Sequence, residues 1–286
     1  MRIAILAFLT FTAYAQQAVD YSKVEIKTTK LAPNFYTLEG SGGTIGVLAG
    51  PDGILMVDSQ FAPLTDKIVA AIHQISPAPI RFMIDTHVHP DHTGGNENLG
   101  KLGVAIFARE ELRARLIANK MPAAGLPVVT YSSPLTFHLN GEEAVAMPVL
   151  AAHTDGDTLV WFPKSNVIMI GDFFRTLGYP NIDRANGGSL NGMMKGIEMA
   201  MNLCGPDTKV VPGHGAITDR AGLAAHLAMI QTIRDRVAKL IQEGKTSEQI
   251  VASHPTADYD SKVPGVGTTA DRFVGQLYAE LTLPNK

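Results

Sequence analysis

Residues 86–95, THVHPDHTGG, place four side chains able to bind a metal within six positions of each other. They are His87, His89, Asp91 and His92. His87 and His89 are alternate residues, so a locally extended backbone lets both face one cation, whereas Asp91 and His92 come later and can face a second. Imidazole and carboxylate groups are ligands that zinc takes, and a catalytic zinc leaves one position for water. The stretch therefore predicts a metal site that needs further ligands from elsewhere in the chain.

Three more candidate ligands each follow a predicted strand, and each lies close to glycine. They are His153 in AAHTDGDT (151–158), Asp172 in IGDFF (170–174) and His214 in VPGHG (211–215). Loops at strand ends, held by a rigid scaffold, are where sites are built, so we expect these ligands to meet at one edge of a sheet. Seven ligands are more than one tetrahedral zinc uses, whereas two metals that share a carboxylate use all seven. The other histidines have no such context and are predicted to be surface or satisfied core residues: His73, His138, His226 and His254.

The order of secondary-structure signals favours two packed sheets. Strands are predicted at 34–39, 44–49, 54–58, 80–85, 104–108, 135–139, 144–150, 159–162, 167–171 and 209–211, and helices at 64–75, 109–119, 189–203, 221–243 and 269–281. Two successive blocks each run from several strands to helices. That order is typical of an α/β chain in which two sheets pack face to face with helices outside.

The spacing His-x-His-x-Asp-His, with the later His153, Asp172 and His214, resembles the metallo-β-lactamase superfamily of zinc-dependent hydrolases over about residues 35–215. The resemblance implies an αββα sandwich of two mixed β-sheets flanked by helices, and usually two zinc ions per chain. By position, the first metal would take His87, His89 and His153, the second Asp91, His92 and His214, and Asp172 would bridge them.

The segment after Asp172, DFFRTLGYPNIDRAN (172–186), is similar to the corresponding loop of true zinc β-lactamases. Arg175 stands where those enzymes have a cation that binds the substrate carboxylate, and Asn181 resembles the asparagine that polarises the lactam carbonyl. The chain departs from that branch twice, because Asp172 stands where the branch has cysteine and His92 is retained, as in glyoxalase II and lactonases. The alternatives are that Arg175 is a plain solvated or ion-paired residue and that Asn181 is a turn residue.

The resemblance implies that a hydroxide held between two metals attacks a carbonyl carbon, with Asp91 orienting it and then protonating the leaving group. The expected substrate is a small molecule with a hydrolysable carbonyl, and an anionic one suits Arg175. The amide of β-lactam antibiotics is the first choice, which would make the chain a resistance enzyme. A lactonase or thioesterase on the same metals, and a zinc-binding protein without catalysis, are the alternatives.

The composition of the chain makes some other classes of protein unexpected. The chain has 286 residues, 45% apolar and 18% charged, with a net charge of −3, so no nucleic-acid partner is expected. No apolar run reaches the ~18 residues that span a bilayer, so no stable membrane insertion is expected. The single cysteine, Cys204, cannot form an internal disulfide and is predicted to be a small buried hydrophobe at a helix end. The oligomeric state is left open.

The N-terminus is predicted to be a signal peptide. Arg2 supplies a positive start, residues 3–11 (IAILAFLTF) an apolar core, and residues 13–15 (AYA) the cleavage pattern. We therefore expect residues 1–15 to be removed and residues 16–286 to form a single hydrolase domain in the periplasm or outside the cell.

Overall fold

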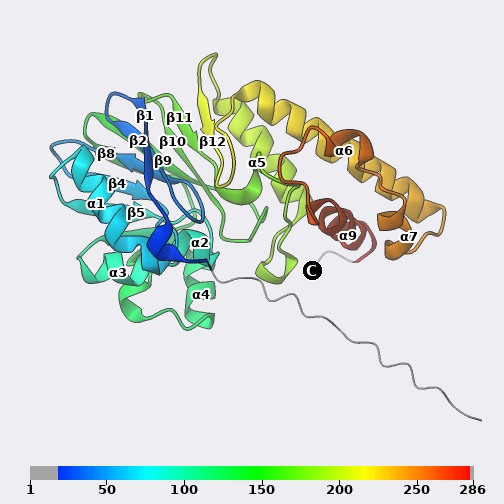
Figure 1. The fold of residues 1–286 in the computed structure, drawn as a ribbon, viewed down its shortest axis with the longest axis horizontal. Coiled ribbons are helices and arrows are strands. Elements are labelled where there is room, and N and C mark those ends of the chain that lie inside the picture. Colours follow the sequence, from blue (N-terminus) through cyan, green and yellow to red (C-terminus); the bar gives the residue numbers. More distant parts are fainter. Residues whose placement is uncertain (1–18, 284–286) are drawn as a thin grey trace, which may run out of the picture.

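The computed structural model describes residues 19–283 and shows two β-sheets with helices on their outer sides (Figure 1). The predicted signal peptide, residues 1–15, lies outside the described residues. No helix within residues 19–283 combines the length and apolar character needed to cross a bilayer.

The first sheet has seven strands that follow one another in chain order. They are β1 (Lys27–Ala32), β2 (Phe35–Glu39), β3 (Ile45–Leu48), β4 (Ile54–Val57), β5 (Ile80–Ile84), β6 (Ala105–Arg109) and β7 (Val129–Tyr131). Strands β1 to β4 pair antiparallel, because short turns join them, and β4 to β7 pair parallel. The parallel connections carry α1 (Thr65–Ile75), α2 (Pro90–Thr93), α3 (Asn96–Lys101) and α4 (Glu110–Ala118).

The second sheet has five strands in the order β12-β11-β10-β9-β8. They are β8 (Leu135–Leu139), β9 (Glu142–Pro148), β10 (Thr158–Phe162), β11 (Val167–Met169) and β12 (Lys209–Val211). Only β11 and β12 pair in parallel, and α5 (Leu190–Leu203) lies between them in the chain. The long helix α6 (Arg220–Gln242) follows β12.

Apolar side chains of the two sheets meet in a shared core, where the rings of Phe35 and Phe162 lie 4.5 Å apart. Strands β3 and β4 are buried along their whole length, which explains their uninterrupted apolar sequences IGVL and ILMV. Outside the first sheet, α1 buries Ile68 and Ile72, which are four residues apart and share one face of the helix. The sequence-predicted αββα sandwich is therefore confirmed.

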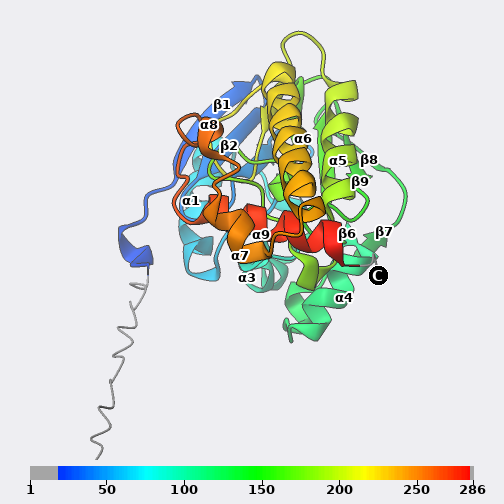
Figure 2. The same ribbon diagram turned by 90° about the vertical axis from the view of Figure 1, so that its right-hand side faces the viewer.

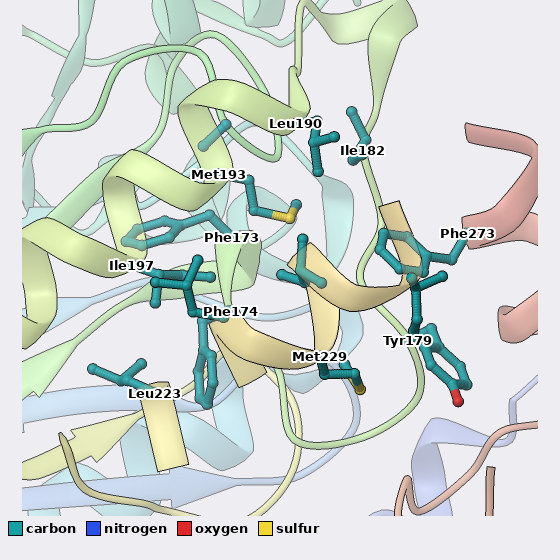
Figure 3. Packing of buried hydrophobic residues seen from close by; sticks show 14 of the residues in the cluster. Phe173, Phe174, Tyr179, Ile182, Leu190, Met193, Ile197, Leu223, Met229 and Phe273 are labelled. Atoms are coloured by element: carbon teal, nitrogen blue, oxygen red, sulfur yellow. The ribbon is translucent and has the colours of Figure 1, made fainter. Parts of the chain in front are cut away.

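A larger apolar cluster covers the outer side of the second sheet, and Figure 3 shows Phe173 and Phe174 among side chains of α5 and α6. Cys204 caps the C-terminus of α5 and is half-buried against this cluster. Three further helices complete the chain: α7 (Ser247–Ala252), α8 (Ala257–Asp260) and α9 (Thr269–Thr282). Helix α9 lies crosswise at one end of α5 and α6 (Figure 2), and its Phe273 stacks on Tyr179 with the ring centroids 6.0 Å apart. The C-terminal helices thereby cover the segment that follows Asp172.

Short 3-10 turns join several of these elements: Tyr21–Lys23, Ala62–Leu64, Ala123–Gly125, Gly171–Phe173 and Arg184–Asn186. Asp172 lies in one of them, three residues after β11 ends at Met169. The predicted strand 167–171 is therefore shorter in the structure, and the left-handed Gly171 (φ 58°) turns the chain before the carboxylate.

Candidate metal centre

The structure brings all seven sequence-predicted ligands together where loops of both sheets meet. His87 and His89 follow β5, Asp91 and His92 lie in α2, and the other three follow β9, β11 and β12. They form three overlapping groups in which the ligand atoms lie within 4.8 Å of one another: His87, His89 and His153; His87, His92 and Asp172; and Asp91, His92 and His214. We call His87, His89 and His153 the first cluster, and Asp91, His92 and His214 the second cluster. Asp172 lies next to both, so the two clusters can hold two metal ions.

In the first cluster, Nδ1 of His89 lies 2.8 Å from Nε2 of His153. The opposite ring nitrogens contact oxygens outside the cluster. Nε2 of His89 lies 2.7 Å from a carboxylate oxygen of Asp183, and Nδ1 of His153 lies 2.7 Å from the backbone oxygen of Asn181. Each of these oxygens can accept a hydrogen bond from the ring N–H beside it. The ring proton then lies on the side away from the cluster, and the other ring nitrogen points its lone pair into the cluster.

In the second cluster, Nε2 of His214 lies 3.0 Å from Oδ2 of Asp91. His92 is fully buried, and its Nδ1 lies 2.7 Å from Oδ2 of Asp58. Asp58 also accepts hydrogen bonds from the backbone N–H of Thr86 at 2.7 Å and from its hydroxyl at 2.8 Å. Asp58 therefore joins the end of β4 to the start of the histidine-rich segment and directs Nε2 of His92 into the cluster.

Asp172 lies between the clusters. Its Oδ1 is 3.4 Å from Nε2 of His92, and its Oδ2 is 3.3 Å from Nε2 of His214 and 4.0 Å from Nε2 of His153. One oxygen thus faces the second cluster and the other faces ligands of both clusters. This is the position from which a carboxylate can contact two cations.

Three buried atoms that could bind a metal have no hydrogen-bond partner within residues 19–283. They are Nε2 of His87, Nε2 of His92 and Oδ1 of Asp172. Buried polar atoms in folded proteins are almost always paired, because an unpaired one costs about 1–3 kcal/mol. All three belong to the group of ligand atoms that lie within 4.8 Å of one another. A cation there satisfies all three, so the residues present fit a metal.

Two glycines allow the ligands to approach the backbone. A Cβ atom added at Gly213 would lie 2.0 Å from Oδ1 of Asp172, and one added at Gly43 would lie 2.2 Å from a ring carbon of His92. Both distances are far inside van der Waals contact. These glycines are therefore required by the packing around the second cluster.

The protonation states of the first cluster and of Asp172 suit a cation. Burial lowers the pKa of His153 to about 4 and holds the pKa of His87 well below its usual range, so both rings are neutral at pH 7. Burial would raise the pKa of Asp172, but His92 and His214 outweigh it and keep that pKa well below its usual range. Neutral imidazole and ionised carboxylate are the forms that bind metal.

His214 behaves differently in the metal-free protein. Burial lowers its pKa, but hydrogen bonds to Asp172 and Asp91 outweigh that effect and raise the pKa to about 9. The ring then carries a proton at pH 7 in the place where a cation would bind. A metal ion that bound to His214 would displace this proton.

The structure places Asn181 beside the first cluster but turns its side chain toward α9. Its backbone oxygen contacts His153, while its side-chain oxygen accepts a hydrogen bond from Nε2 of Gln276 at 2.8 Å. Arg175 lines a cavity together with His226, and its Nε is buried without a hydrogen-bond partner among residues 19–283. The roles predicted for Asn181 and Arg175 toward substrate stay predictions.

Sequence reasoning missed the groups that hold the ligands in place. Asp58 is the last residue of the predicted strand 54–58, and the candidate ligands come just after theirs, so its position was a usable signal. Gln276 lies in a helix remote in sequence and gave no signal. His226 was predicted to be a surface or satisfied residue, and this is wrong, because its Nε2 is buried and has no partner. His73, His138 and His254 are exposed, as predicted.

The sequence profile of the metallo-beta-lactamase superfamily matches residues 38–225, which include every candidate ligand. The chain belongs to the metallo-beta-lactamase superfamily. It is therefore a hydrolase of a superfamily that binds metal, typically zinc, and the resemblance seen in the sequence is confirmed.

Two relatives carry the name of this family. The chain is 24% identical to a metallo-beta-lactamase type 2 of Bacillus cereus over 181 residues, which is 63% of this chain and 69% of the relative. It is 23% identical to one of Bacteroides fragilis over 230 residues, 74% of this chain and 88% of the relative.

Among solved structures, a metallo-beta-lactamase from Pontibacter korlensis has a TM-score of 0.64 at 20% identity and covers 72% of this chain and 99% of its own. A stereoselective inverting sec-alkylsulfatase from Pseudomonas sp. has a TM-score of 0.70 at 16% identity and covers 90% of this chain and 50% of its own. At these identities the similarity shows the fold alone.

Proposed function

We propose that the protein is an exported hydrolase that uses two zinc ions to open a carbonyl substrate, with the amide of β-lactams as the first choice. The observation that supports this most is the pair of three-ligand clusters of imidazole and carboxylate groups, with Asp172 next to both. When bound, zinc lowers the pKa of water to about 7 and polarises a carbonyl oxygen.

The protein's own residues would orient the ligands and move protons. Asp183, Asp58 and the backbone of Asn181 fix the ring protons of the histidines. Asp91 is the ligand with the most exposed side chain, at 26%, and only Oδ2 contacts His214. Its other oxygen can therefore hold a proton and deliver it to a leaving group at the solvent side of the centre.

Asn181 would bind the substrate carbonyl. Gln276 uses the side-chain oxygen of Asn181, so the amide nitrogen is left to donate. Arg175 would bind a substrate carboxylate, as the sequence resemblance implies.

The choice of β-lactams is supported by relatives named metallo-beta-lactamase and by the predicted export, since β-lactams are encountered outside the cytoplasm. One observation favours other substrates. Asp172 and His92 both line the centre, which is the ligand set that resembles lactonases and glyoxalase II. A lactonase or thioesterase is therefore the second candidate.

The test is a rate panel with a chromogenic cephalosporin, an acyl-homoserine lactone, a thioester and a secondary alkyl sulfate, each with and without chelator. The preferred class should exceed the others by more than about tenfold in kcat/KM, which is about 1.4 kcal/mol. His89→Ala should abolish turnover, whereas His138→Ala, at an exposed position, should leave it unchanged. Absence of chelator-sensitive hydrolysis in every arm would overturn the proposal.

Two measurements test the remaining parts. Elemental analysis should find two zinc ions per chain, and a folded protein without chelatable metal would contradict the centre. Mass spectrometry of the exported protein should give an N-terminus at Gln16, and an intact Met1 would contradict the predicted signal peptide.

A further inference from the structure

Helix α9 carries a row of polar side chains that hold the loop following Asp172. The row consists of residues three or four positions apart, which share one face of a helix: Thr269, Arg272, Gln276 and Glu280. Gln276 contacts residues 181 and 182 of the loop. The other members of the row contact the loop before and after this segment, at residues 179, 184 and 190.

Gln276 makes two hydrogen bonds to the loop. Its Oε1 accepts from the backbone N–H of Ile182 at 3.0 Å, and its Nε2 donates to Oδ1 of Asn181 at 2.8 Å. Because a backbone N–H can only donate, it determines which end of the Gln276 amide is the oxygen, and this in turn determines the orientation of the Asn181 amide. The side chain of Ile182 is buried in the apolar cluster outside the second sheet (Figure 3). The segment is therefore held by both packing and hydrogen bonds.

The same segment, residues 181–183, supplies the acceptors of two candidate ligands. The backbone oxygen of Asn181 lies 2.7 Å from Nδ1 of His153, and Oδ2 of Asp183 lies 2.7 Å from Nε2 of His89. The backbone N–H of Asp183 also donates to the backbone oxygen of His153 at 3.0 Å. The two rings meet at their other nitrogens, which are 2.8 Å apart. A displacement of this segment would therefore move the acceptors of both histidines.

We propose that Gln276 is a positioning residue of the first cluster. By holding residues 181–183, it keeps the acceptors of His89 and His153 in place, and these acceptors direct the ring lone pairs toward the first metal position. The two hydrogen bonds of Gln276 go to the segment and not to a candidate ligand, so its effect passes through the segment. The inference rests on the metal centre of the proposed function and does not depend on which bond the enzyme hydrolyses.

Three variants separate the hydrogen bonds of Gln276 from its packing. Gln276→Met keeps the length of a half-buried side chain and removes both bonds, because a thioether is at most a weak acceptor. Gln276→Glu keeps an acceptor for Ile182, and its second oxygen can accept from Asn181 once that amide turns over, so the segment stays held. Gln242→Met makes the same change as the first variant at an exposed position at the end of α6 and is the matched control.

The first measurement is amide hydrogen exchange of the metal-free, full-length protein. Gln276→Met should raise the exchange rates of the Ile182 and Asp183 amides by about two- to tenfold, the factor expected for one lost hydrogen bond. The Asp183 amide is the informative one, because its acceptor is His153 and not Gln276. Gln276→Glu and Gln242→Met should leave both rates unchanged. An unchanged rate at Asp183 in Gln276→Met would show that the effect does not reach the ligand and would overturn the proposal.

The second measurement is a stepwise zinc titration against a chromophoric chelator. Replacing a group that orients a metal ligand lowers affinity by about 10–100-fold, and Gln276 acts one step further away, so Gln276→Met should lower the affinity of the first cluster by about three- to tenfold. The second cluster should keep its affinity. Asp183→Asn, which changes the acceptor of His89 itself, identifies the binding step that belongs to the first cluster. Gln276→Glu and Gln242→Met should bind both ions as the wild type does.

Three results of the titration would contradict the role of Gln276. An equal loss at both clusters in Gln276→Met would show a general loosening of the fold. An unchanged first cluster would show that the segment stays in place without Gln276, and an equal loss in Gln276→Glu would show that the two hydrogen bonds are not the cause. Neither the exchange rates nor the titration needs turnover, so failure of the proposed hydrolysis and failure of this role are distinguishable.

Discussion

The buried carboxylate of Asp58 offers the sharpest test of how the second cluster is held. Its side chain is 1% exposed and accepts three hydrogen bonds, one from His92 and two from Thr86. In Asp58→Asn, an amide N–H₂ replaces one of the two oxygens. If the amide nitrogen faces His92, the ring must move its proton to Nε2, the atom that faces Asp91 and Asp172. If the amide is flipped, its nitrogen faces the backbone N–H of Thr86, which cannot move its proton.

The first orientation places a proton on the nitrogen that would bind the metal, and the second leaves one buried N–H against another; either costs about 1–3 kcal/mol. In the first orientation the cost appears as a loss of about 5–150-fold in metal affinity at the second cluster. In the second it appears as lower stability of the folded protein with or without metal, at about 2–4 °C in Tm per kcal/mol. A stepwise zinc titration against a chromophoric chelator measures the first, and thermal unfolding of the metal-free protein measures the second.

Asp183→Asn is the matched control for this experiment. Asp183 contacts Nε2 of His89 in the first cluster and is more exposed than Asp58, at 19%. Its substitution should lower the first zinc affinity and spare the second, by a smaller factor because solvent can replace the lost contact. If Asp58→Asn left both affinities and the metal-free Tm within error of the wild type, the role assigned to Asp58 would be refuted.

Three further outcomes are expected. Gly213→Ala should lose the second metal, because its Cβ would lie 2.0 Å from Oδ1 of Asp172, and elemental analysis should then find one zinc per chain; two would show that the loop yields. Glu280→Ala removes the acceptor for the backbone N–H of Leu190 at 2.7 Å, so KM should rise while metal content stays at two, and an unchanged KM contradicts the loop's role in binding substrate. For His226, the folded pKa of about 4 lies below the usual 6.5, so its contribution to stability is complete above pH 6.5 and falls as the pH drops toward 4. His226→Leu should therefore lose less stability than the wild type over that interval, by up to about 1.4 kcal/mol per pH unit in denaturant titrations, and parallel curves would contradict a neutral buried ring.

The sequence predicted the two-sheet fold because its strands carry strong, uninterrupted apolar signals. Strands β8 and β12 coincide with their predicted limits, and the limits of the other predicted elements are within two residues of those in the structure. Strand β1 was missed because KTTKLA lies at the edge of a sheet, has no fully buried residue and carries little apolar pattern. Strand β7 has only three residues, of which one is buried, so it gave little signal.

The candidate ligands were predictable for a different reason. Their side chains differ chemically from the apolar strands that precede them, and each lies at a strand end, so their spacing in the chain carried the information. Residues that act through a partner carry no such mark. Gln276 resembles any polar residue of an amphipathic helix until the structure shows it bonded to Asn181 and to the backbone N–H of Ile182. The cavity that Arg175 and His226 share likewise depends on three distant segments of the chain.

The hydrogen bonds between α9 and the loop that follows Asp172 have a consequence for the order in which the site is completed during synthesis. Thr269, Gln276 and Glu280 hold Tyr179, Ile182 and Leu190 by their backbone N–H groups. Every candidate ligand has been synthesised by residue 214, whereas the side chains that hold this loop follow at residues 269–280. A nascent chain, or one shortened before α9, would thus have all seven candidate ligands before it has the contacts that hold the loop.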